Sequence, residues 1–205
     1  SLVLSTVAGG FFTSDNHFGH KNILKYCPGR GERWATVEDM NEGMRELWNQ
    51  TVKPGDTVYM LGDVAFWHNP ETLKNYVQSL HGNKFLVLGN HDQNISKNLK
   101  SLQPHPFVQI STYKEIKVTD KALGLDGHKV CLFHYSGRIW TKAHHGSWLL
   151  LGHSHGELEP YGRSVDVGVD SPWVTGKREY RPFSLAEVAA FMKDRDLVAH
   201  HKVDL

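Results

Sequence analysis

Residues 84–92 read Lys-Phe-Leu-Val-Leu-Gly-Asn-His-Asp, an apolar run that ends in a polar turn. The run 84–88 predicts a buried β-strand, and Gly89 permits an unusual backbone conformation directly after it. The turn then carries a carboxamide, an imidazole and a carboxylate, which can all bind a divalent metal. An ordinary polar turn before a helix has the same composition, so this stretch alone does not identify a site.

Four other segments repeat this arrangement of a β-type apolar run followed by metal-binding side chains. They are Asp15-x-His17 after 11–14, Gly62-Asp63 after 57–61, His134 after 129–133, and Gly152-His153-Ser154-His155 after 148–151. Because open α/β sheets place their sites at the carboxyl ends of strands, we expect the five segments to lie together. Their oxygen and nitrogen donors predict two divalent metals side by side, which indicates metal-assisted phosphoester hydrolysis.

Spacing within the segments supports a shared site. If the strand continues through Asp15 and His17, their side chains share one face and present an oxygen and a nitrogen to the same ion. His153 and His155 repeat that spacing with two imidazoles. The carboxylate of Asp63 has two oxygens, with which it can bridge two ions. Each of these signals is weak alone, and their strength lies in their combination.

Composition limits the classes of partner. The 205 residues carry a formal net charge of +1, so no global field attracts the chain to nucleic acid or to an anionic membrane. No window approaches 18 apolar residues, which argues against a transmembrane helix. Cys27 and Cys131 are the only cysteines and favour a reducing compartment, so we expect a cytoplasmic protein. Residues 1–12 lack a basic region and are interpreted as a first strand rather than a signal peptide.

Periodicity predicts a single α/β domain over residues 1–205, with a polar and mobile tail from about Asp194. Helices are expected at 36–52, 70–80, 94–102 and 184–193. The runs 107–111 and 113–119 are expected to pair across a tight turn, and 164–169 is expected to form a further strand.

In order and composition, the five segments resemble the calcineurin-like metallophosphoesterases. That family's pattern of D-x-H, G-D, G-N-H-D/E, H and G-H-x-H is complete here between Asp15 and His155. The opening residues 14–23 resemble a small bacterial and phage-type branch. The resemblance implies a four-layer α/β/β/α sandwich with metals on loops at one edge of the sheets. It also implies a metal-dependent phosphoric ester hydrolase, with a phosphodiesterase favoured over a monoesterase.

The resemblance further implies a role for each matching residue. One metal would be held by Asp15, His17 and His155, the other by Asn90, His134 and His153, and Asp63 would bridge them. His91 would protonate the leaving-group oxygen as general acid during attack by a metal-activated hydroxide. The implied cofactors are two divalent ions. Oxygen and nitrogen ligands without thiolate suit manganese, which we favour, and also iron, zinc, cobalt or nickel.

Residues next to these segments have two interpretations each. Asp92 either orients His91 in catalysis or begins the following helix. Asn16, His20 and Arg138 are candidates for contacting substrate phosphate, against structural or solvated loop roles. Arg30, in a Pro/Gly-rich loop at 27–31, is a weaker candidate.

Three residues near the end of the chain are also open to interpretation. Asp166 and Asp170 are candidates for orienting a ligand histidine. Trp173, in the segment 171–181, covers substrate, packs on a partner or packs on the protein's own surface, and the role of that segment stays open.

The expected partner is a small phosphoester, with a nucleotide among the options, and no membrane. A nuclease acting on DNA or RNA is the first rival, although the near-neutral charge and the lack of a basic-aromatic stripe disfavour an extended polyanion. A noncatalytic protein-interaction scaffold on the same fold is the second, disfavoured because every expected ligand and His91 are present. Physiological substrate, native metals and oligomeric state stay open.

Overall fold

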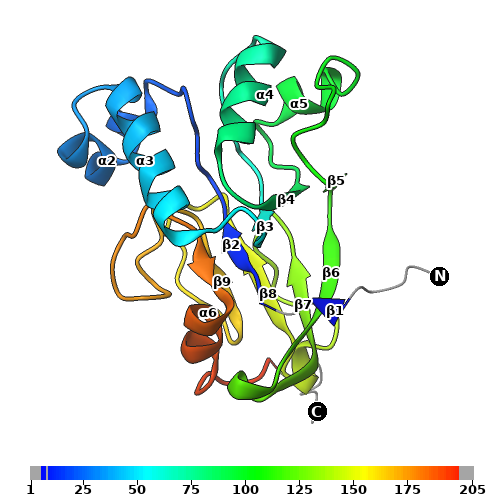
Figure 1. Ribbon diagram of the computed structural model, residues 1–205. Helices are drawn as coiled ribbons and strands as arrows, with labels where there is room; N and C mark the ends of the chain where they lie inside the picture. Colours follow the sequence, from blue (N-terminus) through cyan, green and yellow to red (C-terminus); the bar gives the residue numbers. More distant parts are fainter. Residues whose placement is uncertain (1–5, 8, 199–205) are drawn as a thin grey trace.

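The strands form two five-stranded sheets in the computed structural model, which describes residues 6–7 and 9–198 (Figure 1). The first sheet has the order β10-β2-β3-β4-β5. Its strands are β2 (Phe11–Thr13), β3 (Thr57–Met60), β4 (Asn83–Val87), β5 (Gln109–Ser111) and β10 (Phe183–Ser184). All but the edge strand β10 run parallel, so the chain leaves β2, β3 and β4 at the same edge of the sheet.

The second sheet has the order β1-β6-β7-β8-β9. Its strands are β1 (Thr6–Val7), β6 (Lys114–Asp120), β7 (Leu125–Leu132), β8 (Trp148–Leu151) and β9 (Ser164–Asp166). Only the pair β6 and β7 is antiparallel. The carboxyl ends of β7 and β8 therefore lie together, and they carry His134 and the Gly152–His155 turn.

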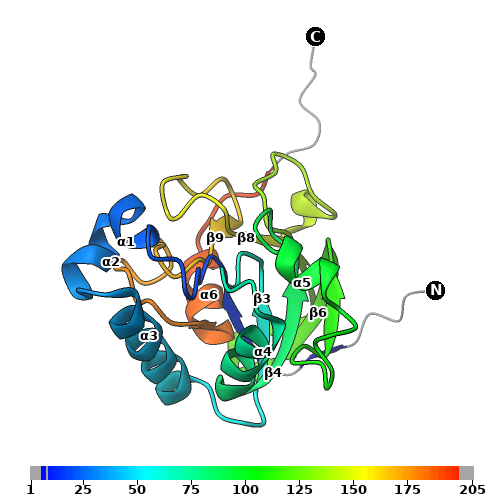
Figure 2. The same ribbon diagram turned by 90° about the horizontal axis from the view of Figure 1, so that it is seen from above.

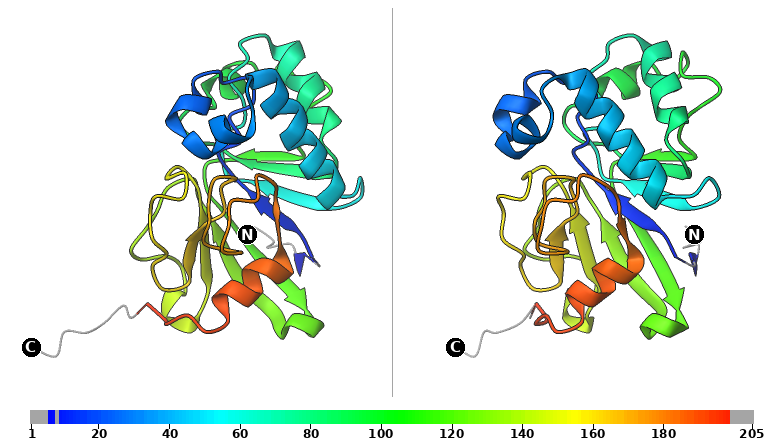
Figure 3. Two further views of the ribbon diagram at one scale, coloured as in Figure 1. Left: turned by 90° about the vertical axis from the view of Figure 1, so that its left-hand side faces the viewer. Right: turned by 60° about the vertical axis from the view of Figure 1, so that its left-hand side comes forward.

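Helices lie mainly on one side of the first sheet. The helices are α1 (Ile23–Tyr26), α2 (Pro28–Arg33), α3 (Val37–Thr51), α4 (Pro70–Ser79), α5 (Gln93–Lys97) and α6 (Leu185–Met192), and the 3₁₀ turns are η1 (Lys121–Leu123) and η2 (Ala143–His145). Figure 2 shows α1, α2 and α3 grouped together, with α4 beside them. In Figure 3 this helical layer lies above the strands, whereas α6 lies at the opposite end of the molecule.

Alternation of apolar residues along the strands builds the layers. In β8, Leu150 packs into the core between the two sheets, whereas Leu149 and Leu151 face outward. The outward face of the first sheet packs against α3, whose Met40, Met44 and Trp48 are buried. A core between two sheets and a helical layer on one of them make this an α/β protein, as predicted.

The outward face of the second sheet is covered differently. Cys131, Leu149 and Leu151 pack there against Trp140 and Ala143, which belong to the segment around η2. Helix α6 instead directs Leu185, Val188 and Met192 into the core between the sheets. Within the described residues, the cover of this face is thus a loop with one 3₁₀ turn.

The predicted pairing of 107–111 with 113–119 is wrong, because β5 and β6 belong to different sheets. Phe107 packs under the helices, whereas Ile116 and Val118 pack between the sheets. The two segments therefore bury their apolar residues in different cores, and the chain passes from one sheet to the other between them.

Other predicted boundaries also shift. The helix expected at 94–102 is α5, which ends at Lys97. Directly after it, the Asn98 side chain donates to the Asn94 carbonyl and competes with the helical backbone. Residues 27–31 are not a loop, because Pro28 begins α2. The strand expected at 164–169 ends at Asp166, whose carboxylate accepts the Gly168 amide.

The structure describes only part of the first strand expected in 1–12 and of the mobile tail expected from about Asp194. Of residues 1–12, positions 1–5 and 8 lie outside the described residues, whereas Thr6–Val7 form β1 and residues 11–12 lie in β2, in different sheets. Of the expected mobile tail, 199–205 lie outside them, whereas Val198 is buried beside Trp140 in the outer core. No described helix combines the length and apolar character needed to cross a bilayer.

Candidate metal centre

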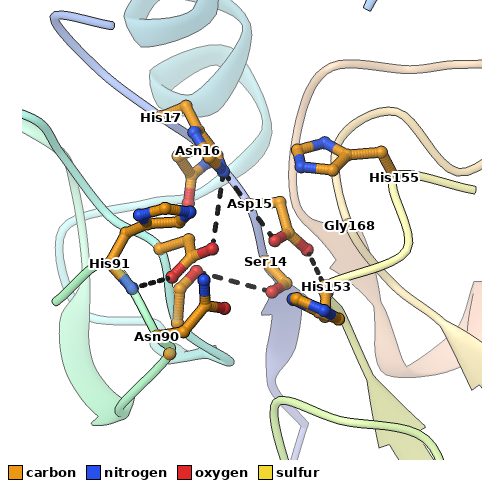
Figure 4. A network of polar contacts seen from close by, with 12 residues as sticks. Ser14, Asp15, Asn16, His17, Asn90, His91, His153, His155 and Gly168 are labelled. Atoms are coloured by element: carbon orange, nitrogen blue, oxygen red, sulfur yellow. Dashed lines mark hydrogen bonds and ion pairs between the residues drawn. The ribbon is translucent and has the colours of Figure 1, made fainter. Parts of the chain in front are cut away.

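The expected metal ligands gather at the edge where strands of both sheets end (Figure 4). Two sets of three side chains each bring one ligand atom within 4.8 Å of the others. The first ligand group is Asp15, His17 and His155, and the second is Asp63, His134 and His153. The Asn90 amide oxygen adjoins the second group, 3.0 Å from His134 Nε2. The structure thus brings together all seven side chains that the sequence predicted as ligands.

The backbone converges by a route that the sequence did not predict. Asp15 and His17 have φ values of +55° and +52°, so the strand does not continue through them. Asp63, His153 and His155 are left-handed as well, with φ of +55°, +69° and +49°. Such backbone is uncommon outside glycine and is typical of functional sites that the surrounding fold holds in place. Left-handed turns, and not extended alternation, therefore direct these side chains to one point.

Backbone hydrogen bonds hold the turns against each other. The Asp15 amide donates to the Gly62 carbonyl and the His17 amide to the Asp63 carbonyl, both at 3.0 Å. Ser14 pairs with Gly168, which joins the end of β2 to the chain after β9. The D-x-H segment is therefore fixed to a neighbouring turn from each sheet.

Asp63 lies between the two ligand groups. Its Oδ2 is 3.6 Å from His17 Nε2 in the first group and 3.5 Å from His134 Nε2 in the second. Its Oδ1 accepts the backbone amide of His91 at 2.8 Å, which fixes the plane of the carboxylate. One oxygen therefore faces both ligand groups, as a bridging carboxylate must.

Two of the expected ligand atoms accept or donate no hydrogen bond within the described residues. Asp15 Oδ1 and His17 Nε2 are buried and make no hydrogen bond. Buried polar atoms are normally satisfied, so unpaired ones need an explanation such as an ion. Asp15 Oδ2, by contrast, accepts the His153 amide at 2.8 Å. The residues present therefore fit a divalent cation, since the free oxygen and nitrogen are hard and borderline donors directed at one place.

Ionisation in the centre is set by burial and by neighbouring charges. Burial raises the pKa of Asp15 to about 7, and the nearby Asp166 carboxylate adds to that effect. Burial lowers the pKa of His17 to about 4, so its imidazole is neutral near pH 7. For Asp63, burial opposes ionisation, but contacts from His134 and His17 hold the pKa of its carboxyl well below its usual range. A bound cation would favour ionised Asp15 and neutral imidazoles.

Glycine is required where the turns meet. A Cβ on Gly62, which has a φ of +101°, would lie 2.5 Å from the Gly89 nitrogen. A Cβ on Gly89 would lie 2.3 Å from Asp63 Oδ1. The glycines therefore let the two turns touch, so that Asp63 and Asn90 reach the same space.

Asp92 supports these turns from behind. Its carboxylate accepts the backbone amides of Asp63, Val64 and Gly89 at 2.7–2.9 Å. It caps α5 only by position and makes no side-chain cap bond. Its position at the start of α5 confirms the helix-terminal interpretation, whereas none of these carboxylate contacts goes to the His91 ring. Asp92 instead joins the turn that carries Asp63 to the turn that carries His91.

Histidine orientation is set by groups outside the ligand set. His134 Nδ1 lies 2.6 Å from the Leu61 carbonyl, which can only accept, so Nδ1 carries the proton and Nε2 is left for a metal. His155 Nδ1 lies 2.8 Å from Asp170 Oδ2. Burial opposes protonation of His155, but this bond raises the pKa of its imidazole to about 10. Asp170 is thus the orienting carboxylate that the sequence suggested.

Asp166 acts on the turn rather than on an imidazole. Its Oδ2 accepts the Ser154 hydroxyl and the Gly156 amide at 2.7 and 2.9 Å. The Trp173 indole donates to the Gly156 carbonyl at 2.9 Å. Trp173 therefore packs beneath the histidine turn, in agreement with the packing interpretation and not with a substrate cover.

A cavity of about 570 Å³ opens beside the centre. Its wall includes the expected ligands His17, Asp63, His153 and His155, and it continues over Ile23, Tyr26, Phe66 and Arg178. His91 is exposed at this cavity, with its ring centroid 5.0 Å from that of Phe66. An acid at that position can reach a bound substrate.

Of the three residues predicted to contact substrate, one lines the cavity and two do not. His20 lines the cavity, stacks on Phe66 with ring centroids 3.8 Å apart and contacts His17 Nδ1 at 3.1 Å. Asn16 is buried and its side-chain atoms have no partner, so it is shielded from the cavity. Arg138 is exposed and is not among the described residues that line the cavity. Arg178 is the arginine that does line it, and no motif indicated this residue.

Two further residues of the centre had little signal in the sequence. Arg30 is fully buried and pairs with Asp170. Burial opposes its protonation, but Asp170 raises the pKa of its guanidinium. Cys27 Sγ lies 3.5 Å from His155 Nδ1 in the cavity wall. Pro28 could have indicated the helix that carries Arg30, but nothing in the sequence indicates its ion pair 140 residues away.

Comparison with known proteins identifies relatives of the whole chain. An uncharacterized protein of Methanocaldococcus jannaschii, MJ1445, is 27% identical over 183 residues, which cover 85% of this chain and 86% of that protein. The gene 66 protein of Mycobacterium phage L5 is 26% identical over 193 residues, covering 78% of this chain and 86% of its own length. No protein-family model matches the chain.

Solved structures add a likeness in fold. The protein of unknown function AQ665 from Aquifex aeolicus has a TM-score of 0.63 and 24% identity, and the match covers 90% of this chain and 99% of that one. A novel archaeal phosphodiesterase has a TM-score of 0.42 and 15% identity over 82% of this chain and 88% of its own. This chain therefore shares its fold with the Aquifex protein, and its function has to be argued from the metal centre.

Proposed function

We propose that this chain is a metal-dependent phosphoesterase of the calcineurin-like metallophosphoesterase type, in the small bacterial and phage branch. One observation carries the proposal. Asp63 Oδ2 faces His17 Nε2 at 3.6 Å and His134 Nε2 at 3.5 Å, each in a separate set of three potential ligands. Two ligand sets that share a carboxylate suit a pair of ions, and paired ions serve phosphoester hydrolysis.

Each residue of the centre has a proposed role. One ion would be held by Asp15, His17 and His155, the other by Asn90, His134 and His153, with Asp63 between them. When bound, the ions would supply charge stabilisation to the phosphate and a more acidic water for attack. We favour manganese, with iron, zinc, cobalt or nickel as alternatives. A single domain over 1–205 belongs to the same proposal, and so does the four-layer sandwich, in which the segment around η2 would form the fourth layer in place of a helix.

His91 is the proposed general acid. Its backbone amide is held by Asp63 Oδ1 at 2.8 Å, while its ring is exposed at the cavity. The ring is therefore positioned from the ligand set without being part of it. It donates its proton to the leaving-group oxygen as the ester bond breaks, and a general acid typically contributes about 10²–10⁴ in rate.

The cavity supports a small substrate. Its volume of about 570 Å³ lies within the range of small-molecule sites. Its wall combines aromatic and apolar residues such as Phe66, Tyr26 and Ile23 with the guanidinium of Arg178. We infer a phosphodiester or phosphomonoester with one apolar or aromatic substituent, of which a nucleotide is an example. An extended nucleic acid is disfavoured by the net charge of +1.

The test is a metal-by-substrate screen. Protein freed of metal by a chelator is given Mn²⁺, Fe²⁺, Zn²⁺, Co²⁺ or Ni²⁺ and assayed on bis- and mono-p-nitrophenyl phosphate, on 2′,3′-cyclic nucleotides and on DNA and RNA. We expect hydrolysis of a small ester that requires added metal. Turnover of nucleic acid alone would favour the nuclease, and no turnover with any metal would favour a noncatalytic scaffold.

A further inference from the structure

Arg30 is a buried cation in the short helix α2, directly behind the first ligand group. Its side chain is 0% exposed, so its charge needs full compensation by nearby acceptors. No step of the proposed hydrolysis uses it, because it is shielded from the cavity. Its neighbours show what the charge is used for.

All the strong contacts of Arg30 lead to the first ligand group. Nε and Nη2 donate to the two carboxylate oxygens of Asp170 at 2.9 and 2.7 Å. Nη2 also donates to the Asp15 carbonyl at 2.5 Å, and Nη1 to the Asn16 carbonyl at 2.7 Å. Asp170 Oδ2 accepts in turn from His155 Nδ1 at 2.8 Å. One guanidinium thus joins the D-x-H segment to the carboxylate that orients His155.

The second ligand group is supported by other contacts. His134 donates to the Leu61 carbonyl, the Asp63 amide donates to Asp92, and the His153 amide donates to Asp15. None of the hydrogen bonds of Arg30 among the described residues reaches Asp63, His134 or His153. The two ligand groups therefore differ in what holds them.

The D-x-H segment needs such support. Asp15 and His17 are both left-handed, and strained backbone persists only where its surroundings determine it. The carbonyls of Asp15 and Asn16 are held by two arms of one planar guanidinium. Lysine has a single ammonium and cannot reproduce this fork.

We propose that Arg30 is a positioning residue that pre-forms the first ligand group and sets the affinity of that group for a divalent ion more directly than the affinity of the second. This inference rests on the proposed two-ion centre and extends it. It predicts that the two ions respond differently to one buried residue that touches neither.

The experiment is a titration of chelator-treated protein with Mn²⁺ alone, in which isothermal titration calorimetry measures the binding of each ion. The variants are Arg30→Lys, which keeps the charge, and Asp170→Asn, which removes the ion pair from the other side. Circular dichroism checks that each is folded. Arg33→Lys is the matched control, because Arg33 ends the same helix but is exposed over the rings of Trp34 and Tyr180.

We expect wild type and Arg33→Lys to bind two ions. In Arg30→Lys and in Asp170→Asn one ion should bind about 10–100-fold more weakly, as is typical when a partner behind a ligand is lost, and the other should be unchanged. Saturating Mn²⁺ should restore turnover to Arg30→Lys, since every ligand remains. Two ions bound with wild-type affinity in both variants, or an equal loss at both positions, would overturn the proposal.

Double variants identify the affected position. Arg30→Lys should be non-additive with His155→Ala, which damages the same ligand group, and additive with His153→Ala, which damages the other. The reverse pattern contradicts the proposal. The readout is metal binding, so wild-type protein that binds two ions but hydrolyses no phosphoester rejects the proposed function, while the titration still decides the role of Arg30.

Discussion

The carboxylate of Asp15 accepts the backbone amide of His153 at 2.8 Å, across 138 positions of sequence. Asp15 belongs to the first ligand group and His153 to the second, so one oxygen of Asp15 supports the other ion's ligand while its second oxygen is unpaired. The two groups are therefore connected through Asp15 as well as through Asp63. Substitutions in the centre should show how each residue contributes to metal binding, catalysis or stability.

Replacement of Asp63 by asparagine should remove metal from both positions. The bridging oxygen loses its negative charge, and both His17 and His134 then face a neutral amide. We expect total metal, measured by plasma mass spectrometry after dialysis, to fall from two ions per chain towards none. Asp126→Asn, on the exposed part of β7, is the control. Two ions retained in Asp63→Asn would exclude the bridge.

His91→Ala should separate catalysis from metal binding. The ring is not a member of either ligand group, so two ions should remain, while loss of the acid should lower turnover at least about tenfold. Turnover of bis-p-nitrophenyl phosphate and metal content are measured on the same preparation, with exposed His145→Ala as control. If turnover is unchanged, His91 has no part in the reaction.

Asp92→Ala tests whether this carboxylate holds the turns. Three backbone amides, two of them in buried hydrogen bonds, would lose their acceptor, which should lower the free energy of unfolding by at least about 2 kcal/mol. Urea unfolding measures it, and Asp92→Asn, which keeps one acceptor oxygen, should lose less. An Asp92→Ala variant that is as stable as wild type but slow in turnover would indicate instead that Asp92 orients His91 in catalysis.

Arg178→Ala should weaken substrate binding. Arg178 lines the cavity and belongs to neither ligand group, so we expect KM to rise several-fold with kcat little changed. Lys177→Ala is the matched control, because Lys177 is the adjacent cation and is exposed, with its ammonium beside Glu179. Equal effects of the two variants would indicate a general charge effect instead of a specific contact.

Lys84 should make stability depend on alkaline pH. Burial lowers the pKa of its ammonium from 10.5 to about 8. Between these values the unfolded chain keeps a proton that the folded chain has lost, so the free energy of unfolding rises with pH, by roughly 1–3 kcal/mol. Lys84→Met should lack this rise and exposed Lys53→Met should keep it, in urea unfolding at pH 7.5 and 10. The same slope in all three proteins would contradict the assignment.

The sequence alone predicted the α/β class and which seven candidate ligand side chains lie together at one edge. Each candidate follows an apolar run that favours a buried strand, and strand ends of parallel sheets meet at one edge. Hydrophobic periodicity and capping residues are local signals, so α3, α4 and α6 were placed within a few residues.

Only the tertiary structure decided how the centre is held. The left-handed turns at Asp15 and His17 have no signature in the sequence. The ion pair of Arg30 with Asp170 joins residues 140 positions apart, and Asp92 binds the amides of Asp63 and Val64 from 29 and 28 positions away. Likewise, β5 and β6 belong to different sheets because the two segments bury their apolar side chains in different cores. The residue types that can bind a metal are visible in short stretches of sequence. The orientation of these side chains depends on buried charges and backbone contacts that exist only after the two sheets have packed together.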